Sequence, residues 1–239
     1  MKPFFSSLLT IFLSVLLFSS CEKLDGVGPV VSERRLHTGF ESVDIRTPGN
    51  VKHTVGAEYR VIIHSQQNII DVLQTRLNGT ELIIKLKDGV QLKRGNEIDI
   101  EIQSPVLKSV FLGGAGNVEL LSDMNQNSIT FHLAGSGNIT AQDLIIGDRL
   151  RATLSGSGNI ILRGSSADVA WYKISGSGNI EAENVIVRDG YAEISGSGNI
   201  RVHASESLEA IISGSGSIRY RGNPQIDPHI TGSGSLTRY

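Results

Sequence analysis

Apolar and polar residues alternate along the second half of the chain. Ahead of a glycine-rich turn at residues 156–158, the apolar residues Leu150, Ala152 and Leu154 are separated by polar ones, and Ile160 resumes the pattern behind the turn. Because successive side chains of a β-strand point to opposite faces, this spacing of two predicts strands with one buried face on both sides of the turn.

The turn itself is repeated. A motif of the form Gly-x-Gly-Asn/Ser-apolar occurs seven times, 18 to 21 residues apart, starting at Gly114, Gly135, Gly156, Gly176, Gly196, Gly214 and Gly232. Matching apolar residues flank every copy, so equivalent positions fall into inward columns. A fixed period of this length is typical of a solenoid, in which each strand lies ~4.8 Å from its copy in the next coil. The sequence therefore predicts an all-β fold, a β-solenoid with about 20 residues per coil.

Glycine and asparagine are expected to have different roles in these turns. Glycine reaches positive φ and lets adjacent coils approach closely, so a change such as Gly158→Val should be strongly destabilising. The asparagines fall in one column and are expected to form an amide ladder, with Ser217 and Ser235 replacing them in the last two turns. The predicted structural turn residues are Gly135, Gly137, Asn138, Gly156, Gly158, Asn159, Gly176, Gly178, Asn179, Gly196, Gly198 and Asn199.

The first half of the domain, residues 36–112, is less regular. Four apolar runs in it predict strands, at residues 62–63, 82–86, 98–102 and 106–112. Apolar residues at helical spacing, from Ile69 to Leu77, predict one short helix over residues 68–77. Residues 48–50 (Pro-Gly-Asn) resemble a worn copy of the turn motif. We expect this half to start the solenoid and to cap its end.

The N-terminus has the features of an export signal. Lys2 is followed by an apolar and small-residue stretch that ends in Ser19 and Ser20, directly before Cys21. This arrangement resembles the lipobox of bacterial lipoproteins, although Phe18 stands where leucine is usual. Cys21 is therefore the predicted lipidation site. An ordinary signal peptide or an uncleaved anchor is the alternative, but the stretch is short for a membrane span of ~20 residues.

These features divide the chain into three parts. We predict a lipoprotein signal peptide over residues 1–20, a polar tether over residues 21–35 and a single solenoid domain over residues 36–239, with its repeat region at 113–239. Glu22 is not the aspartate that typically retains lipoproteins at the inner membrane. The expected location is therefore the outer membrane, to which the protein is exported and held by its lipid.

Composition and charge argue against several functions. The formal net charge of −2 leaves no basic field for nucleic acid, and the single cysteine forbids an internal disulfide. The glycine motif lacks the aspartate of calcium-binding repeats, and a strand follows it where a phosphate-binding loop needs a helix. The six histidines show no metal-ligand spacing, and each is expected on the surface. We predict neither a metal nor a cofactor.

Outward positions can be identified from the same alternation. Trp171 and Tyr191 occupy one outward column on adjacent coils, where they could form a platform for a sugar or a protein partner. The alternative is an aromatic cross-strand pair that stabilises the sheet. Lys173 faces Glu193 in the neighbouring column, and the next face pairs Glu181 with Arg201. These opposite charges are expected to set register, and no pair of carboxylates suggests catalysis.

The repeated Gly-Ser-Gly-Asn-Ile, at residues 135–139, 156–160, 176–180 and 196–200 behind a lipoprotein-like leader, resembles the putative autotransporter adhesin family known as the head GIN domain (domain of unknown function 2807). The resemblance covers about residues 36–239. Its first strand is entered by Phe40-Glu41-Ser42-Val43-Asp44-Ile45, which is similar to the start of the family's domain. It implies a pectin-lyase-like, right-handed parallel β-helix without a catalytic constellation, and a role in cell adhesion.

Three functions remain in view. The first is a non-catalytic cell-envelope lipoprotein that acts as an adhesin or binding module for a glycan or a surface protein. The second is a structural envelope protein that forms a homo-oligomer through the uncovered end of the solenoid, three residues after the last turn. The third is a carbohydrate-active enzyme, which would need two carboxylates ~5 to 9 Å apart in a groove.

Overall fold

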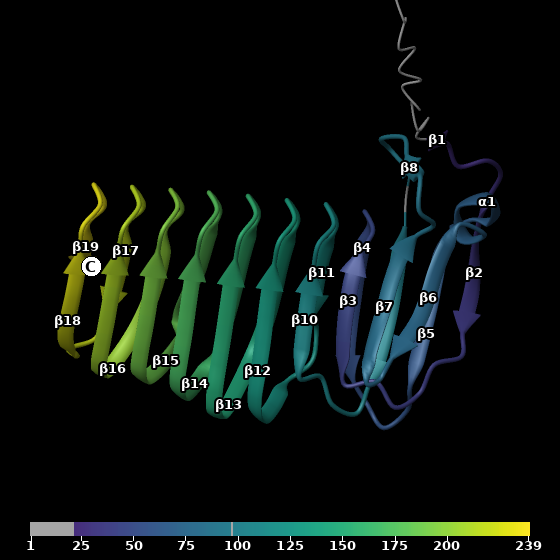
Figure 1. Ribbon diagram of the computed structural model, residues 1–239. Helices are drawn as coiled ribbons and strands as arrows, with labels where there is room; N and C mark the ends of the chain where they lie inside the picture. The colour runs from purple at the N-terminus through teal and green to yellow at the C-terminus, as the bar shows by residue number, and fades with distance from the viewer. Residues whose placement is uncertain (1–21, 97) are drawn as a thin grey trace, which may run out of the picture.

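Parallel strands are stacked along the length of the chain in the computed structural model, which describes residues 22–96 and 98–239 (Figure 1). Within these residues, 17 strands belong to one continuous sheet, and strands of the repeat region pair in parallel with their copies in the next coil. Ile160, for example, lies beside Ile180, one coil further on. The predicted all-β solenoid with a period of about 20 residues is confirmed.

Each coil of the repeat region has two faces that meet at the glycine turn. We call the segments that lead into the turns, such as residues 169–174, the pre-turn face, and the segments that leave them, such as residues 179–182, the post-turn face. The strands are β12 (Met124–Leu133), β13 (Asn138–Leu154), β14 (Asn159–Ile174), β15 (Asn179–Ile194), β16 (Ile200–Ile212), β17 (Ile218–Arg221), β18 (Gln225–Ile230) and β19 (Leu236–Arg238). The long strands β13 to β15 run from one turn to the next, and their registers shift between the two faces.

The inward columns form the core. The apolar residues directly before and after each turn are fully buried, at Leu133, Leu154, Ile174, Ile194 and Ile212, and at Ile139, Ile160, Ile180, Ile200 and Ile218. Equivalent apolar residues of successive coils therefore stack on one another. Their burial stabilises the folded state by roughly 25 cal/mol for each Å² of apolar surface removed from water. Ile230 occupies the same column in β18 but is 43% exposed, because no described strand lies beyond it.

The repeat glycines differ from the expectation in one respect. Positive φ occurs at other glycines, such as Gly49 and Gly222, and not in the seven repeated turns. What requires glycine in the turns is the distance between coils, since a Cβ added at Gly158 would overlap the carbonyl oxygen of Gly137. Close approach of two backbones is therefore the reason for glycine there.

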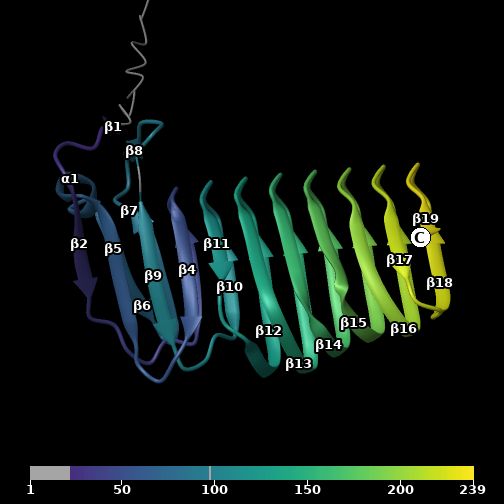
Figure 2. The ribbon, with the colours of Figure 1, turned by 180° about the vertical axis from the view of Figure 1, so that it is seen from behind.

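The first half continues the solenoid and closes its end, as predicted. Its strands are β3 (Ser42–Arg46), β4 (Asn50–Val55), β5 (Arg60–Gln66), β6 (Leu73–Asn78), β7 (Glu81–Leu86), β8 (Val90–Leu92), β9 (Asp99–Ser104), β10 (Ser109–Leu112) and β11 (Asn117–Leu120). β7, β3 and β10 extend the pre-turn face in parallel, and β9, β4 and β11 extend the post-turn face. Beyond them, β6 pairs antiparallel with β7 and β5 with β9 (Figure 2).

The predicted helix is shorter than expected. Helix α1 covers Gln67–Ile70, and residues 73–78 belong to β6, so the prediction of a helix over 68–77 is wrong for its second part. Leu73 and Leu77 pair with Leu86 and Leu82 of β7, which satisfies the backbone of the segment in an antiparallel ladder. Within the described residues, no helix has the length and apolar character needed to cross a membrane.

The predicted tether also differs from the structure. β1 (Glu22–Leu24) pairs with β8, and β2 (Val30–Arg35) lies antiparallel to β5 along six residue pairs. Residues 30–35 therefore belong to the cap of the solenoid, and the prediction of a tether is wrong there. The physical reason is that β5 would otherwise leave its outer edge of backbone N–H and C=O groups unpaired.

His53 is the exception to the expectation that the histidines lie on the surface. It points inward from β4, in the column that contains Leu120 and Ile102, and is 1% exposed. Its Nε2 lies 2.9 Å from the Oγ of Ser104, and its Nδ1 has no hydrogen-bond partner. Desolvation by burial lowers the pKa of His53 to about 4.

Candidate functional site

The pre-turn face brings Trp171 and Tyr191 together as neighbours in adjacent coils, as their column predicts. Their ring centroids lie 5.5 Å apart and their planes differ by 9°, so the rings are stacked. The guanidinium carbon of Arg151, one coil earlier, lies 5.2 Å from the centroid of the Trp171 ring. A continuous stack of Arg151, Trp171 and Tyr191 therefore runs along the axis of the solenoid.

This stack leaves one ring face uncovered. Trp171 lies between Arg151 and Tyr191, whereas the neighbour of Tyr191 on its other side is Glu209. Tyr191 is 38% exposed, and Glu209 is half-buried without a hydrogen bond or ion pair to any described residue. The stack borders a hollow of about 270 Å³ in the pre-turn face. An aromatic ring and a carboxylate are thus both available to a partner at one place.

The predicted charge pair beside the stack is present. Lys173 Nζ lies 2.8 Å from a carboxylate oxygen of Glu193 on the next coil, and both side chains are about half-exposed. An exposed pair of this kind is worth at most about 1 kcal/mol. Its position, directly across two parallel strands in register, suits a role in holding the coils in alignment.

The post-turn face contains the predicted asparagine ladder. In each coil the Nδ2 of one asparagine donates to the Oδ1 of its predecessor at 2.9 to 3.1 Å, along the series Asn50, Asn117, Asn138, Asn159, Asn179 and Asn199. The worn turn at residues 48–50 is therefore the first member of the ladder. Each link uses one N–H of the amide, and the second N–H makes no hydrogen bond to a described residue.

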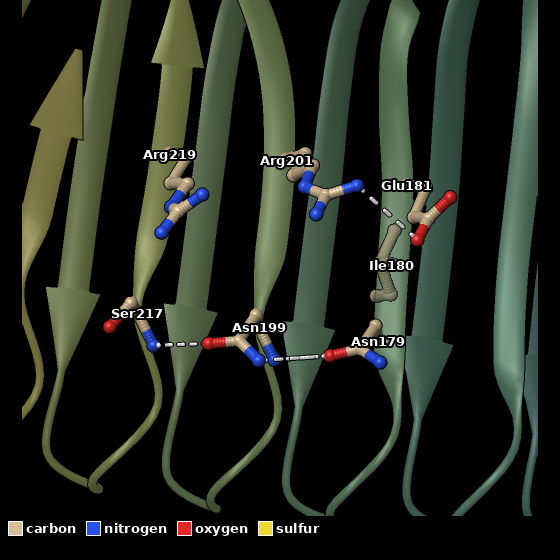
Figure 3. A pocket seen from close by; sticks show the side chains of 7 residues that line it. All are labelled: Asn179, Ile180, Glu181, Asn199, Arg201, Ser217 and Arg219. Atoms are coloured by element: carbon tan, nitrogen blue, oxygen red, sulfur yellow. Dashed lines mark hydrogen bonds and ion pairs between the residues drawn. The ribbon is translucent and has the colours of Figure 1, made fainter. Parts of the chain in front are cut away.

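The ladder of amides ends at Ser217. The backbone N–H of Ser217 donates to Asn199 Oδ1 at 3.1 Å, but its hydroxyl lies 3.1 Å from the Ser235 hydroxyl and makes no bond to Asn199. Beside this change lies a hollow of about 270 Å³, with the guanidinium groups of Arg201 and Arg219 on one side and the ladder on the other (Figure 3). We call this hollow the ladder-end pocket.

The ladder-end pocket is positively charged on one side. Arg201 lies 3.5 Å from Glu181 and 3.9 Å from Glu183, whereas Arg219 makes no hydrogen bond or ion pair with a described residue. No ligand site was expected here from the sequence. Its signal was nevertheless present, because serine replaces asparagine in the turn where the second of two arginines follows at the same outward position.

Metal ligands do not gather in the part of the chain that the structure describes, where no three histidine, cysteine, aspartate or glutamate side chains come together. Cys21 and the predicted signal peptide, residues 1–20, lie outside the described residues.

Comparison with protein families decides the relationship of the chain. The sequence model of the family described as putative auto-transporter adhesin, head GIN domain, matches residues 39–224. The chain belongs to this family. The match spans β3 to β17 of the head GIN solenoid and leaves out β1 and β2 at one end and β18 and β19 at the other. The family is described as one of putative auto-transporter adhesins, a description that indicates an exported or cell-surface protein.

Solved structures share the head GIN fold over their whole length. A putative adhesin from Bacteroides fragilis NCTC 9343 is 26% identical with a TM-score of 0.86, covering 90% of this chain and 100% of the other. A putative lipid binding protein from Parabacteroides distasonis ATCC 8503 is 25% identical with a TM-score of 0.73, covering 91% and 100%. A putative adhesin from Parabacteroides merdae ATCC 43184 is 19% identical with a TM-score of 0.71, covering 91% of this chain and 99% of the other, and it supports the fold. Comparison with curated proteins finds no match.

Proposed function

We propose that this head GIN protein is a non-catalytic adhesin or binding module of the cell envelope, and that its partner binds the pre-turn face around Trp171 and Tyr191. Membership of an adhesin family supports a binding role. The observation that carries the choice of face is the stack of Arg151, Trp171 and Tyr191, which ends in an uncovered ring beside the carboxylate of Glu209. Such a ring face can stack on the apolar face of a sugar or on a planar side chain.

The stack alone does not require a partner, because aromatic cross-strand pairs also stabilise sheets. The hollow beside it favours binding, since a purely structural pair needs no adjoining space and no unpaired carboxylate. Half-buried Glu209 is partly removed from water without a compensating partner in the described chain. A ligand that donates a hydrogen bond to Glu209 while covering Tyr191 would satisfy both groups at once.

We expect the double variant Trp171→Ala, Tyr191→Ala to lose binding by roughly tenfold or more, because it removes the stacking surface that anchors the partner. The measurement is retention of the purified domain on immobilised mucin, together with a glycan array. Phe111→Ala is the matched control, since Phe111 lies on the same face under the guanidinium of Arg46 but away from the hollow. Binding that survives the double variant unchanged would remove this face from the proposal.

We further propose that a lipid on Cys21 holds the domain at the outer membrane. The support is the lipobox-like sequence Phe18-Ser19-Ser20-Cys21 behind an apolar leader. In the variant Cys21→Ser we expect most of the protein to leave the membrane fraction, because a peripheral solenoid without its acyl chains has little apolar surface for the bilayer. Fractionation and labelling with a radioactive fatty acid measure this. Equal labelling of variant and wild type would contradict the assignment.

Protease treatment of intact cells then decides the orientation. An adhesin must face outward, so we expect digestion of the domain in whole cells without permeabilisation. Protection until the outer membrane is opened would contradict the adhesive role while leaving the lipid anchor intact.

A further inference from the structure

The ladder-end pocket arises from a single change in the repeat. Five asparagines in successive turns, from Asn117 to Asn199, place an amide at the same outward position, and Ser217 then places a shorter hydroxyl there. Beside the missing amide lies a hollow of about 270 Å³, which is lined by Asn179, Ile180, Glu181, Asn199, Arg201, Ser217 and Arg219 (Figure 3). The hollow is therefore built by side chains of defined register and not by a loose loop.

The two arginines of this pocket lie side by side in adjacent coils. Arg201 and Arg219 are direct register partners on adjacent parallel strands. Like charges placed directly opposite one another destabilise a sheet. In the same column, Lys52 with Glu119 and Glu181 with Arg201 are pairs of opposite sign. On the pre-turn face Lys173 and Glu193 are also of opposite sign, whereas Glu209 and Asp227 are a second register pair of like charge. An anion placed between Arg201 and Arg219 would remove the repulsion.

The donors around the pocket suit an oxyanion. A guanidinium group is a planar fork that matches a carboxylate, and Arg219 has no other ion pair among the described residues. On the other side of the pocket, the second N–H of Asn199 Nδ2 is available to an acceptor. The Ser217 hydroxyl can also donate to one when Ser235 is the donor of the hydrogen bond between the two hydroxyls. The ligand group would therefore be held by charge on one side and by neutral donors on the other (Figure 3).

The charges along the ladder limit what can be attached to this anion. Glu181, which is paired with Arg201, lines the pocket itself. Away from the pocket the same outward column continues with Ile161, Thr140 and Glu119, while the amide N–H groups of the ladder continue beside them. A uniformly anionic polymer would meet the carboxylates of Glu181 and Glu119. A neutral chain that offers hydroxyl groups to the amides would not.

We propose that the ladder-end pocket binds the carboxylate of an acidic sugar at the end of a glycan, and that the neutral sugars behind it lie along the asparagine ladder. The inference extends the proposed binding role to a second face. It does not depend on the stack of Trp171 and Tyr191, because that stack lies on the pre-turn face and the ladder-end pocket lies on the post-turn face.

The test compares two soluble probes by NMR titration of the folded domain. Sialyllactose has a terminal carboxylate on a neutral disaccharide, and lactose is the same disaccharide without the acidic sugar. We expect sialyllactose to bind with shifts at the side-chain amides of Asn179 and Asn199, and lactose to bind at least tenfold more weakly. Binding of sialyllactose should weaken as salt is raised, because Arg219 is exposed and Arg201 is half-exposed.

Two variants assign the binding to this pocket. Arg219→Gln removes the unpaired cation, and we expect roughly tenfold weaker binding of sialyllactose with an unchanged thermal midpoint. Ser217→Asn is expected to extend the ladder by one amide and to fill the hollow, so it should abolish binding while keeping the fold. Arg94→Gln, a change of the same charge at an exposed and unpaired arginine in the loop after β8, is the control that should bind like wild type.

Several outcomes would overturn the inference. These are no binding of sialyllactose at millimolar concentration, equal binding of lactose, tighter binding of polygalacturonate, or full binding by Ser217→Asn. If inorganic phosphate binds and sialyllactose does not, the pocket is a simple anion site and the proposed glycan ligand is wrong. Sialyllactose binding that persists in the Trp171→Ala, Tyr191→Ala variant separates this result from the fate of the proposed pre-turn site.

Discussion

Replacing Gly158 with alanine is expected to prevent the repeat region from folding, with a loss of at least about 4 kcal/mol in the free energy of unfolding. The added Cβ would overlap the carbonyl oxygen of Gly137 in the preceding coil. The coil cannot move away to make room, because Gly178 makes the same close approach to Gly158 from the other side. One methyl group would therefore separate strands that the rest of the coil holds in register.

The matched control is Gly147→Ala, the same substitution at a glycine inside β13, away from the turns. The nearest atom to a Cβ at this position is the side-chain Oδ1 of Asn127, at 3.3 Å, and Gly147 does not have positive φ. We expect this variant to unfold within about 1 kcal/mol of the wild type, because a strand glycine carries its own entropic disadvantage. Urea denaturation followed by circular dichroism, together with the soluble yield, compares the two. A Gly158→Ala protein that unfolds at the same urea concentration as Gly147→Ala would refute the close-approach explanation.

Acidification is expected to destabilise the first half of the solenoid through His53. The Ser104 hydroxyl donates to the backbone oxygen of Val106 at 2.8 Å, so its oxygen is left to accept from the Nε2–H of His53 at 2.9 Å. Nδ1 is then a bare lone pair in the core, without a partner. Protonation would place a positive charge and an unsatisfied N–H there, which is why burial lowers the pKa of His53 to about 4.

The sign of the effect follows from the two states. Between pH 6.5 and pH 4 the histidine of the unfolded chain binds a proton while the buried histidine does not, so the unfolded state gains stability as the pH falls. The stability that the folded state gains from a neutral His53 is fully present above pH 6.5 and is lost as the pH falls to about 4. The difference between these pKa values corresponds to roughly 3 kcal/mol.

The variant His53→Leu tests this assignment. Leucine is apolar like Leu120 and Ile102, its neighbours in the same inward column. We expect urea denaturation at pH 7 and at pH 4 to show a loss of stability in the wild type that exceeds the loss in the variant by roughly 3 kcal/mol. His229→Gln, at an exposed histidine, should behave like wild type. Equal pH dependence in His53→Leu and wild type would assign the effect to other groups.

The repeat region was predictable because its tertiary contacts are themselves periodic. Ile160 packs beside Ile180 and Asn159 bonds to Asn179, each about 20 residues away in the sequence. Residues at equivalent positions of successive repeats are therefore in contact in the structure. For this reason the inward columns and the ladder can be identified from the sequence. The adjacency of Trp171 and Tyr191 follows from the same register.

The first half lacks this advantage. The spacing of Ile69, Ile70, Leu73 and Leu77 fits one face of a helix, but Leu73 and Leu77 lie in a strand because β7 offers them a ladder. Residues 30–35 are polar enough for a tether, yet they pair with β5 because its edge needs a partner. In both cases a pairing between non-equivalent segments overrides a local pattern.

The sequence by itself determined the solenoid, its period, the buried columns and the amide ladder, because each of these repeats one local unit beside its copy. Only the tertiary structure decided how the end is capped, that His53 lies in the core, that Arg151 completes the aromatic stack and that a hollow opens where Ser217 ends the ladder. These features depend on the volumes and orientations of side chains that meet across strands. A hydrophobic pattern records which face a residue occupies, but not the space that its neighbours leave around it.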